Sequence, residues 1–236
     1  MRSFLFLCCI VITIQSSAQS EKQEQRKLKF GISGGINFSR TPAISYIDIT
    51  PSYKNYRKSK FAIGAAAKLT MEYKTSQHFS LQPEVGFGYY HQKQVYSSSP
   101  VNARISYGHD DDLYVTSVTL GNMFKYSTKY FSVLTGPQVD FPLSAKITSL
   151  WKSESSLTDI HEEIYKVDLK KEKKLSGAAF NWIFGLEHKV IENLAIQVSY
   201  QLGLSKYTET HINWNIDTIR GLYIGAAYQF RCCLYC

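Results

Sequence analysis

The sequence predicts an all-β protein that folds as an eight-stranded antiparallel up-and-down transmembrane β-barrel. Several runs alternate apolar with polar residues, and this period of two is that of a β-strand. The gaps between successive runs are short and long in turn, as in barrels with short periplasmic turns and long extracellular loops. One face of each run is apolar, whereas the other combines Gly and Ala with polar and charged residues.

The first 18 residues, Met1–Ala18, are predicted to form a secretory signal peptide. Arg2 supplies a positive start, Phe4–Ile14 is apolar, and small residues precede a cleavage point near Gln19. A retained helical anchor is disfavoured, because the apolar run is shorter than the roughly 20 residues that a spanning helix needs. The alternative of a lipoprotein signal is disfavoured because no small residue precedes either early cysteine.

Residues 28–230 are then expected to form the barrel domain, followed by a C-terminal tail at 231–236. With the amino end in the periplasm, the short connections face the periplasm and the long ones face outward. The predicted strands are Lys29–Phe38, Phe61–Tyr73, Phe79–His91, Leu113–Tyr126, Tyr130–Ala145, Ser176–Glu187, Ala195–Leu204 and Thr218–Phe230. The long connections are Ser39–Lys60, Gln92–Asp112, Lys146–Leu175 and Ser205–Asp217, and the short ones lie near Thr75–His78, Ser127–Lys129 and His188–Asn193.

The runs also predict which face contacts lipid. Odd-numbered positions are apolar in Phe61–Tyr73 and largely so in Phe79–His91, and even-numbered positions are apolar in the last two runs. Aromatic rings stand near the ends of the apolar face, which suits the two lipid–water boundaries. A soluble barrel that carries an apolar ligand would reverse the faces, so the pattern favours the membrane barrel.

The polar face is expected to fill the lumen, because eight strands enclose a space just wide enough for side chains. We expect these charges to form an ion-pair network around Lys68 and Lys125, since unpaired charges in a poorly hydrated lumen are costly. The alternative is a proton or ion path, or a gate. The predicted lumenal charges are Lys68, Glu72, Glu84, Lys125, Asp140 and Glu187.

The chain carries a formal net charge of +8, with most Lys and Arg in the predicted outer loops. Such loops suit contact with anionic lipopolysaccharide, although a solvated surface of mixed charge explains them as well. No nucleic acid partner is expected. Three cysteines, Cys232, Cys233 and Cys236, end the chain, and their spacing resembles a redox or metal pair without enough zinc ligands.

No catalytic, cofactor-binding or metal site is predicted, and neither HExxH nor GxSxG is present. A lipid A-modifying enzyme around His91 is the alternative, since His91 lies at the outer end of its strand on the lipid side. His109, His161 and His211 are expected in three different outer loops, and Asp110–Asp112 is expected to form a solvated loop tip.

Four segments are spread over nearly the whole mature chain: Phe30–Phe38, Leu81–Phe87, Phe131–Pro137 and Leu222–Phe230. They resemble the PorT-like outer membrane β-barrel family of Gram-negative bacteria. This resemblance implies a cell-envelope barrel, and some named relatives are linked to protein secretion and gliding machinery. The tail Arg231–Cys236 departs from the family, whose barrels usually finish at an aromatic such as Phe230.

The function expected from the sequence is that of a small monomeric outer membrane barrel, non-enzymatic, with a structural or binding role through its extracellular loops. The long loop Lys146–Leu175 is the expected contact surface, with Trp151 and Tyr165 as anchors for an extracellular or envelope protein. The alternatives are a lipid-modifying enzyme, a narrow channel or a component of a secretion complex.

Overall fold

The computed structural model describes residues 28–40, 46–49, 53–100, 105–155, 158–172, 175–207 and 218–231. The predicted signal peptide and the three tail cysteines lie outside these residues. No helix within the described ranges is long and apolar enough to cross a membrane. The strands are β1 (Leu28–Arg40), β2 (Tyr46–Ile49), β3 (Tyr53–Lys74), β4 (Phe79–Pro100), β5 (Ile105–Ser127), β6 (Phe131–Ser155), β7 (Thr158–Asp168), β8 (Ala179–Ile191), β9 (Leu194–Gly203) and β10 (Arg220–Arg231).

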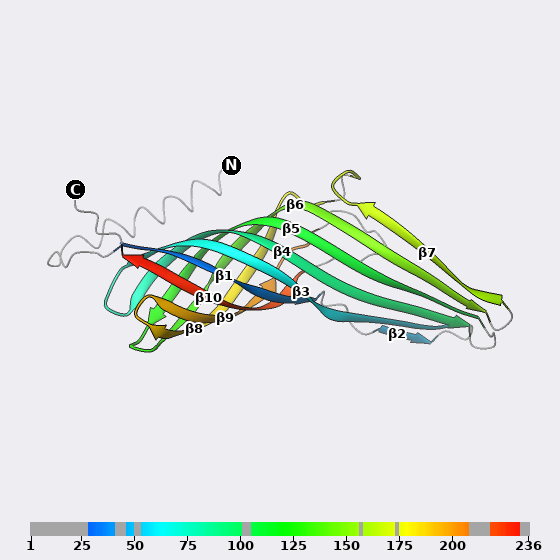
Figure 1. Cartoon of the computed structure of the whole chain (residues 1–236), viewed down its shortest axis with the longest axis horizontal. Helices are drawn as coiled ribbons and strands as arrows, with labels where there is room; N and C mark the ends of the chain where they lie inside the picture. The colour runs from blue at the N-terminus through cyan, green and yellow to red at the C-terminus, as the bar shows by residue number, and fades with distance from the viewer. Residues whose placement is uncertain are drawn as a thin grey trace.

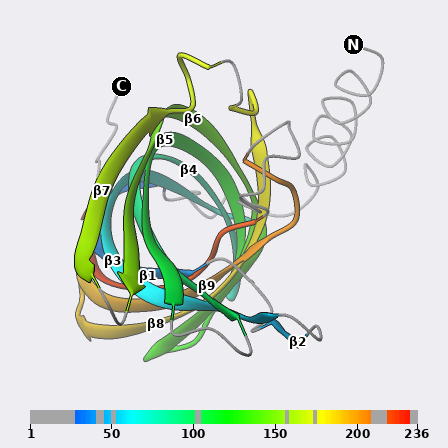
Figure 2. The same cartoon turned by 90° about the vertical axis from the view of Figure 1, so that its right-hand side faces the viewer.

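Eight of these strands form a closed antiparallel ring, as the alternation predicts (Figure 2). The order around the ring is β1-β3-β4-β5-β6-β8-β9-β10, and β10 returns to β1. The closing pair runs in register from Lys29 opposite Arg231 to Arg40 opposite Arg220. Closure gives each ring strand two hydrogen-bonded neighbours, which is required where lipid offers no partners for backbone groups.

The ring strands differ greatly in length, and this corrects the expected loop boundaries. β3, β4, β5 and β6 have 22 to 25 residues, whereas the other four ring strands have 10 to 13. The excess continues outward as a sheet, to which β2 adds at β3 and β7 adds at β6 (Figure 1). We call this projection, made of β2, β7 and the outer parts of β3–β6, the extracellular sheet.

The predicted loop Gln92–Asp112 was therefore wrong in its described part, which is strand in both β4 and β5. The predicted loops Ser39–Lys60 and Lys146–Leu175 also contain strand, including β2 and β7. Both faces of these segments carry polar residues, so the contrast between faces that marks the lipid-crossing part is missing there. Smaller differences concern single ends: β8 begins at Ala179 rather than Ser176, and β10 includes Arg231.

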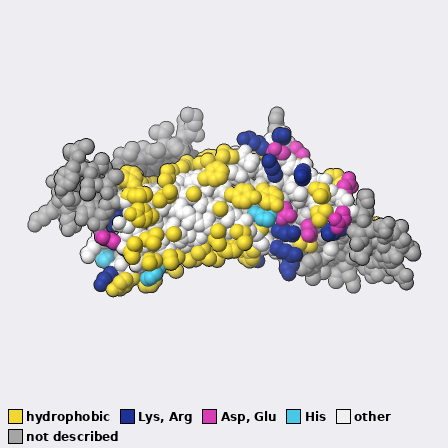
Figure 3. Space-filling view, viewed as in Figure 1, with side chains coloured by type: hydrophobic (Ala, Val, Ile, Leu, Met, Phe, Trp, Pro, Cys, Tyr) yellow, Lys and Arg dark blue, Asp and Glu magenta, His cyan; other side chains and the backbone are white. Residues whose placement is uncertain are grey.

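The apolar faces lie on the outside of the barrel, which confirms the predicted assignment. Leu69 in the middle of β3 exposes 59% of its surface although it belongs to a regular strand. Phe79, Tyr126 and Phe131 mark the periplasmic end of the apolar surface, and Phe61 and Phe141 mark its outer end. Figure 3 shows hydrophobic side chains over the barrel wall, whereas charged side chains gather over the extracellular sheet.

A β-bulge in β3 separates the lipid-crossing part from the extracellular sheet. Between the pairs Phe61–Gln92 and Ala65–Tyr89, β3 advances four residues while β4 advances three. Side chains of β1 bond to carbonyls of β4 here: the Asn37 amide donates to the Tyr89 carbonyl at 3.0 Å, and the Ser39 hydroxyl donates to the His91 carbonyl at 2.7 Å. A side chain at Gly64 would meet the Tyr89 carbonyl, so this crossing requires glycine.

Candidate functional site

The periplasmic half of the lumen holds an ion-pair cluster around Lys125. Its ammonium lies 2.6 Å from a Glu187 carboxylate oxygen and 3.2 Å from a Glu72 carboxylate oxygen, and only 3% of its side chain is exposed. Glu72 also accepts hydrogen bonds from Ser80 and Gln229. The cluster joins β3, β5 and β8 across the lumen, so it fixes the strands relative to one another.

A second pair lies further outward. The Lys68 ammonium is 2.5 Å from Glu84 and also donates to the Gln138 side-chain oxygen at 3.2 Å. The expected network around Lys68 and Lys125 is thus confirmed for Glu72, Glu84 and Glu187.

Asp140 differs from the expectation because no cation among the described residues lies within ion-pair distance of it. It accepts hydrogen bonds from the Tyr207 hydroxyl and from the Gln138 amide, the latter at 2.6 Å. The Gln201 amide donates at 3.4 Å to Oδ2 of Asp140, the same oxygen that accepts from Tyr207. Neutral hydrogen-bond donors therefore replace the ion pair that was predicted for this carboxylate. One of these donors, Tyr207, lies in the connection that follows β9.

The outer end of the lumen is filled by a buried apolar cluster. Part of it comes from strand positions that continue the lumenal face, such as Leu113 and Ile147. The rest comes from residues that follow or precede strands, including Leu169, Tyr207 and Ile219, all at most 1% exposed. The Ser176 amide donates to the Tyr207 carbonyl at 2.8 Å, which ties two outer connections together. We call this cluster the outer seal. In the sequence, the outer seal is marked only by apolar residues within polar connections. The sequence-based prediction did not include these residues.

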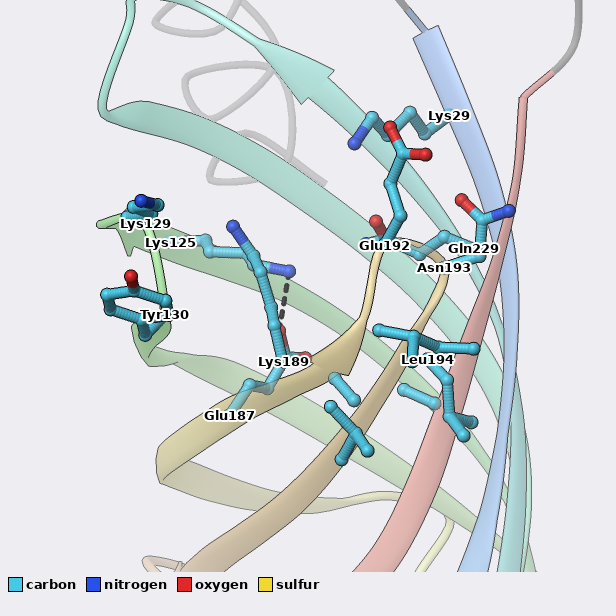
Figure 4. A pocket seen from close by; sticks show the side chains of 14 residues that line it. Lys29, Lys125, Lys129, Tyr130, Glu187, Lys189, Glu192, Asn193, Leu194 and Gln229 are labelled. Carbon is cyan, nitrogen blue, oxygen red and sulfur yellow. Dashed lines mark ion pairs between the residues drawn. The ribbon is translucent and has the colours of Figure 1, made fainter.

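The periplasmic end is more open. Figure 4 shows side chains around a cavity of about 400 Å³ whose lining includes Lys29, Lys129 and Lys189, with the Lys125–Glu187 pair at its wall. Two of these lysines are engaged locally: Lys189 donates to the Thr128 carbonyl at 3.1 Å, and Lys129 lies over the Tyr130 ring. The lumen is therefore accessible from the periplasm and filled by side chains at its outer end.

The extracellular sheet has a concave face that continues the lumenal face. Three rings stack across it: Tyr96 and His109 have centroids 4.8 Å apart, and His109 and Trp151 have centroids 4.6 Å apart. Backbone pairing places Tyr96 opposite His109 and His109 opposite Trp151, so one side chain comes from each of β4, β5 and β6. Tyr165 stands opposite Ser149 on the same face. The predicted anchors Trp151 and Tyr165 are thus brought to one face, exposed by 43% and 47%.

The outer face of the same sheet carries rows of charge. Asp112 lies 2.8 Å from the His91 ring, and Asp110 lies 3.7 Å from Lys93. Asp111 points to the concave face, where it lies 3.3 Å from the His109 ring. The expectation of a solvated loop tip at Asp110–Asp112 was therefore wrong, because strand pairing gives each carboxylate a cross-strand or same-strand partner.

The two of these histidines whose side chains the structure describes, His91 and His109, do not converge. His91 lies on the outer face and His109 on the concave face, whereas the His161 side chain and His211 fall outside the described residues. Within the described ranges, no group of three or more His, Cys, Asp and Glu side chains is arranged to hold a metal ion.

An antiparallel barrel with an apolar belt outside and polar side chains inside defines a transmembrane β-barrel of an outer membrane. The chain belongs to the family described as "Outer membrane protein beta-barrel domain", whose profile matches residues 17–209, and it is an outer membrane protein. No curated protein matches the sequence.

Solved structures of outer membrane proteins resemble the chain weakly. The attachment invasion locus protein Ail of Yersinia pestis is 16% identical over 86% of this chain and 99% of its own, with a TM-score of 0.39. OprG of Pseudomonas aeruginosa is 13% identical over 90% and 100%, with a TM-score of 0.41. Neisserial surface protein A is 11% identical over 86% and 97%, with a TM-score of 0.40. Similarities of this size carry no information about function.

Proposed function

We propose that the protein is a non-enzymatic binding protein whose barrel anchors the extracellular sheet above the membrane. The observation that carries the proposal is the projection of β3–β6 beyond the ring, widened on both sides by β2 and β7. A rigid sheet that presents Trp151 and Tyr165 on one face is suited to contact, because aromatic side chains provide much binding energy per residue. A purely structural barrel has no need for this projection.

The filled lumen supports a binding role over the alternative of a narrow channel. The outer seal and the buried ion pairs occupy the bore, and an eight-stranded barrel has little room beside them. Planar bilayers that contain the purified protein should therefore stay silent in single-channel recordings, and steady conductance would favour the channel.

The outer face of the extracellular sheet supports contact with lipopolysaccharide. Lys58, Lys60 and Lys146 are exposed just beyond the apolar belt, at the level where phosphate groups of the outer leaflet lie. Lys-to-Gln replacement of these three residues should weaken binding of lipopolysaccharide to the nanodisc-embedded protein, with Lys171→Gln as the control.

A specific observation keeps the lipid-modifying alternative as a second candidate. His91 bonds to Asp112 at 2.8 Å on the outer face, and its ring stacks on Tyr114 with centroids 4.5 Å apart. A histidine oriented by a carboxylate is suited to act as a general base. Mass spectrometry of lipid A from cells with the wild-type protein, with His91→Ala and without the gene tests this: identical lipid in all three removes the enzyme.

The binding role is tested on the concave face. Nanodisc-embedded protein is compared with the Trp151→Ser/Tyr165→Ser variant for binding to arrays of glycans and extracellular proteins. Lys189→Gln, at the periplasmic end, is the matched control. We expect at least one ligand that binds the wild type and the control but loses about tenfold in affinity with the double variant. Equal binding by all three proteins, or no binding by any, would count against the proposal. We also propose that the chain is related to the PorT-like family. The partner proposed for the extracellular sheet is an extracellular or envelope protein.

A further inference from the structure

β7 is an edge strand of the extracellular sheet. Within the part of the chain that the structure describes, it pairs with β6 alone, from Lys146 opposite Asp168 to Ser155 opposite Thr158 (Figure 2). Its other edge presents backbone donors and acceptors that are free to pair with another strand. Ile164, in the middle of β7, exposes 62% of its surface, more than many residues of the lipid-facing belt.

β7 is complementary to a second copy of itself. When two β7 strands pair antiparallel with Ile164 opposite Ile164, each strand keeps its outer face on the same side of the joined sheet. Leu150 stands opposite Ile164 in β6, so an apolar row of two leucines and two isoleucines crosses the joint. Cross-strand apolar pairs of this kind stabilise sheets.

The charges match in the same register. Glu162 then stands opposite Lys166 of the second copy, and the symmetry makes this contact twice. Within its own chain, Glu162 lies 2.9 Å from Lys152 of β6, so each row places one carboxylate between two ammonium groups. If the register between the two β7 strands shifts by one residue pair in either direction, Ile164 no longer faces Ile164. Glu162 then no longer faces Lys166 on both sides of the axis.

The concave side of the joint is complementary too. Glu163 stands opposite Tyr165 of the second copy, and the Tyr165 hydroxyl already donates a hydrogen bond to the Glu163 carboxylate of its own strand. Each of these two symmetric pairs joins a carboxylate to a neutral phenol. No like charges therefore face each other across the two-fold axis on the concave side.

The membrane dictates where the second copy lies. The two-fold axis of such a pairing is perpendicular to the sheet, and the sheet stands on the membrane, so the axis lies in the membrane plane. Rotation about this axis turns the second barrel upside down. We infer that β7 pairs with β7 of a second copy in a facing membrane, which makes the protein a homotypic contact between two outer membranes. The barrel is then monomeric within each membrane. This inference rests on the proposed binding role and names its partner.

The contact has a predictable span. Ile164 pairs with Leu150, and Leu143 is the last exposed apolar residue of the belt in β6. With about 3.3 Å per residue and a tilt of roughly 40°, Ile164 lies about 18 Å above the belt. Two copies should therefore hold the apolar surfaces of two membranes roughly 35 Å apart.

Charge variants of β7 test the pairing with proteoliposomes that carry the full mature chain. Wild-type vesicles should cluster in light scattering, and cryo-electron microscopy of the contacts should show the predicted spacing. Glu162→Lys alone sets lysines against lysines, and Lys166→Glu alone sets glutamates against glutamates. Each should slow clustering at least tenfold. Lys171→Glu makes the same charge change as Lys166→Glu but lies outside β7, so it should cluster like the wild type.

The decisive measurement mixes the two variants. Vesicles with Glu162→Lys and vesicles with Lys166→Glu should cluster with each other, because every contact between them joins opposite charges. Wild-type vesicles that stay dispersed, single variants that cluster normally, or a mixture that stays dispersed would each overturn the inference. Heat-modified migration on gels verifies that every variant is folded. If clustering fails while the Trp151/Tyr165-dependent ligand binding persists, the self-pairing is wrong and the proposed function stands.

Discussion

At the scale of residues, stability depends on satisfying polar groups in places where water has little access. Lys125 illustrates this in the lumen, where one ammonium serves the carboxylates of Glu72 and Glu187. Asn37 illustrates it in the wall, where a side chain satisfies a carbonyl at the β3 bulge. Both depend on contacts between strands that lie far apart in the sequence.

Lys125→Met should destabilise the barrel by about 3–5 kcal/mol, because it leaves two buried carboxylates without their cation. The free energy of unfolding is measured by urea titration in detergent. Lys152→Met, which removes the exposed partner of Glu162, is the control and should change little. Unchanged stability of the Lys125 variant would mean that the ion-pair cluster does not hold the barrel together.

Asn37→Ala should cost about 1–3 kcal/mol, because the Tyr89 carbonyl loses its donor. The same titration measures it, and Asn122→Ala on the exposed side of β5 is the control. A cost no larger than that of the control would show that the bulge needs no side-chain donor.

At the scale of elements, strand length separates two sets. β1, β8, β9 and β10 have lengths near the membrane thickness, whereas β3–β6 continue as the extracellular sheet. The projecting parts of β4 and β5 have neighbours on both sides, whereas β7 has one neighbour among the strands that the structure describes. Pairing on both sides protects backbone amides from solvent, and an edge leaves half of them accessible.

Amide hydrogen exchange should therefore be faster in Thr158–Asp168 than in the projecting part of β5, Ile105–Asp112. Mass spectrometry of the protein in nanodiscs measures the exchange, and the spanning part of β5 gives the slow reference. Equal protection of β7 and β5 in single nanodiscs would indicate that the free edge of β7 is covered.

At the scale of the whole molecule, the decisive feature is a cylinder that is apolar outside and polar within. Leu69→Arg, in the middle of the belt, should cost about 2–4 kcal/mol in lipid bilayers. Thr148→Arg, on the outer face of β6 beyond the belt, should cost far less. Refolding into vesicles with urea titration measures both. A mature chain that stays dissolved and monomeric in buffer without detergent would contradict the membrane assignment.

The membrane barrel, its ring of eight strands and its lipid-facing side were predictable from the amino-acid sequence alone. Each strand that crosses the lipid must place apolar residues at every second position, whatever its neighbours are. This alternation can therefore be recognised within a single run such as Phe79–His91. The charged lumenal residues were predictable for the same reason, since they occupy the alternate positions.

Features that depend on neighbouring strands were not predictable in this way and are visible only in the folded molecule. The outward extension of β3–β6, the partners of Asp140 and the use of Leu169 and Tyr207 in the outer seal all arise from contacts between distant segments. Beyond the lipid no solvent forces one face to be apolar, so Gln92–Asp112 carries no local sign of being strand. Its conformation comes from the strands beside it, and pairing between strands is a property that no single stretch of sequence contains.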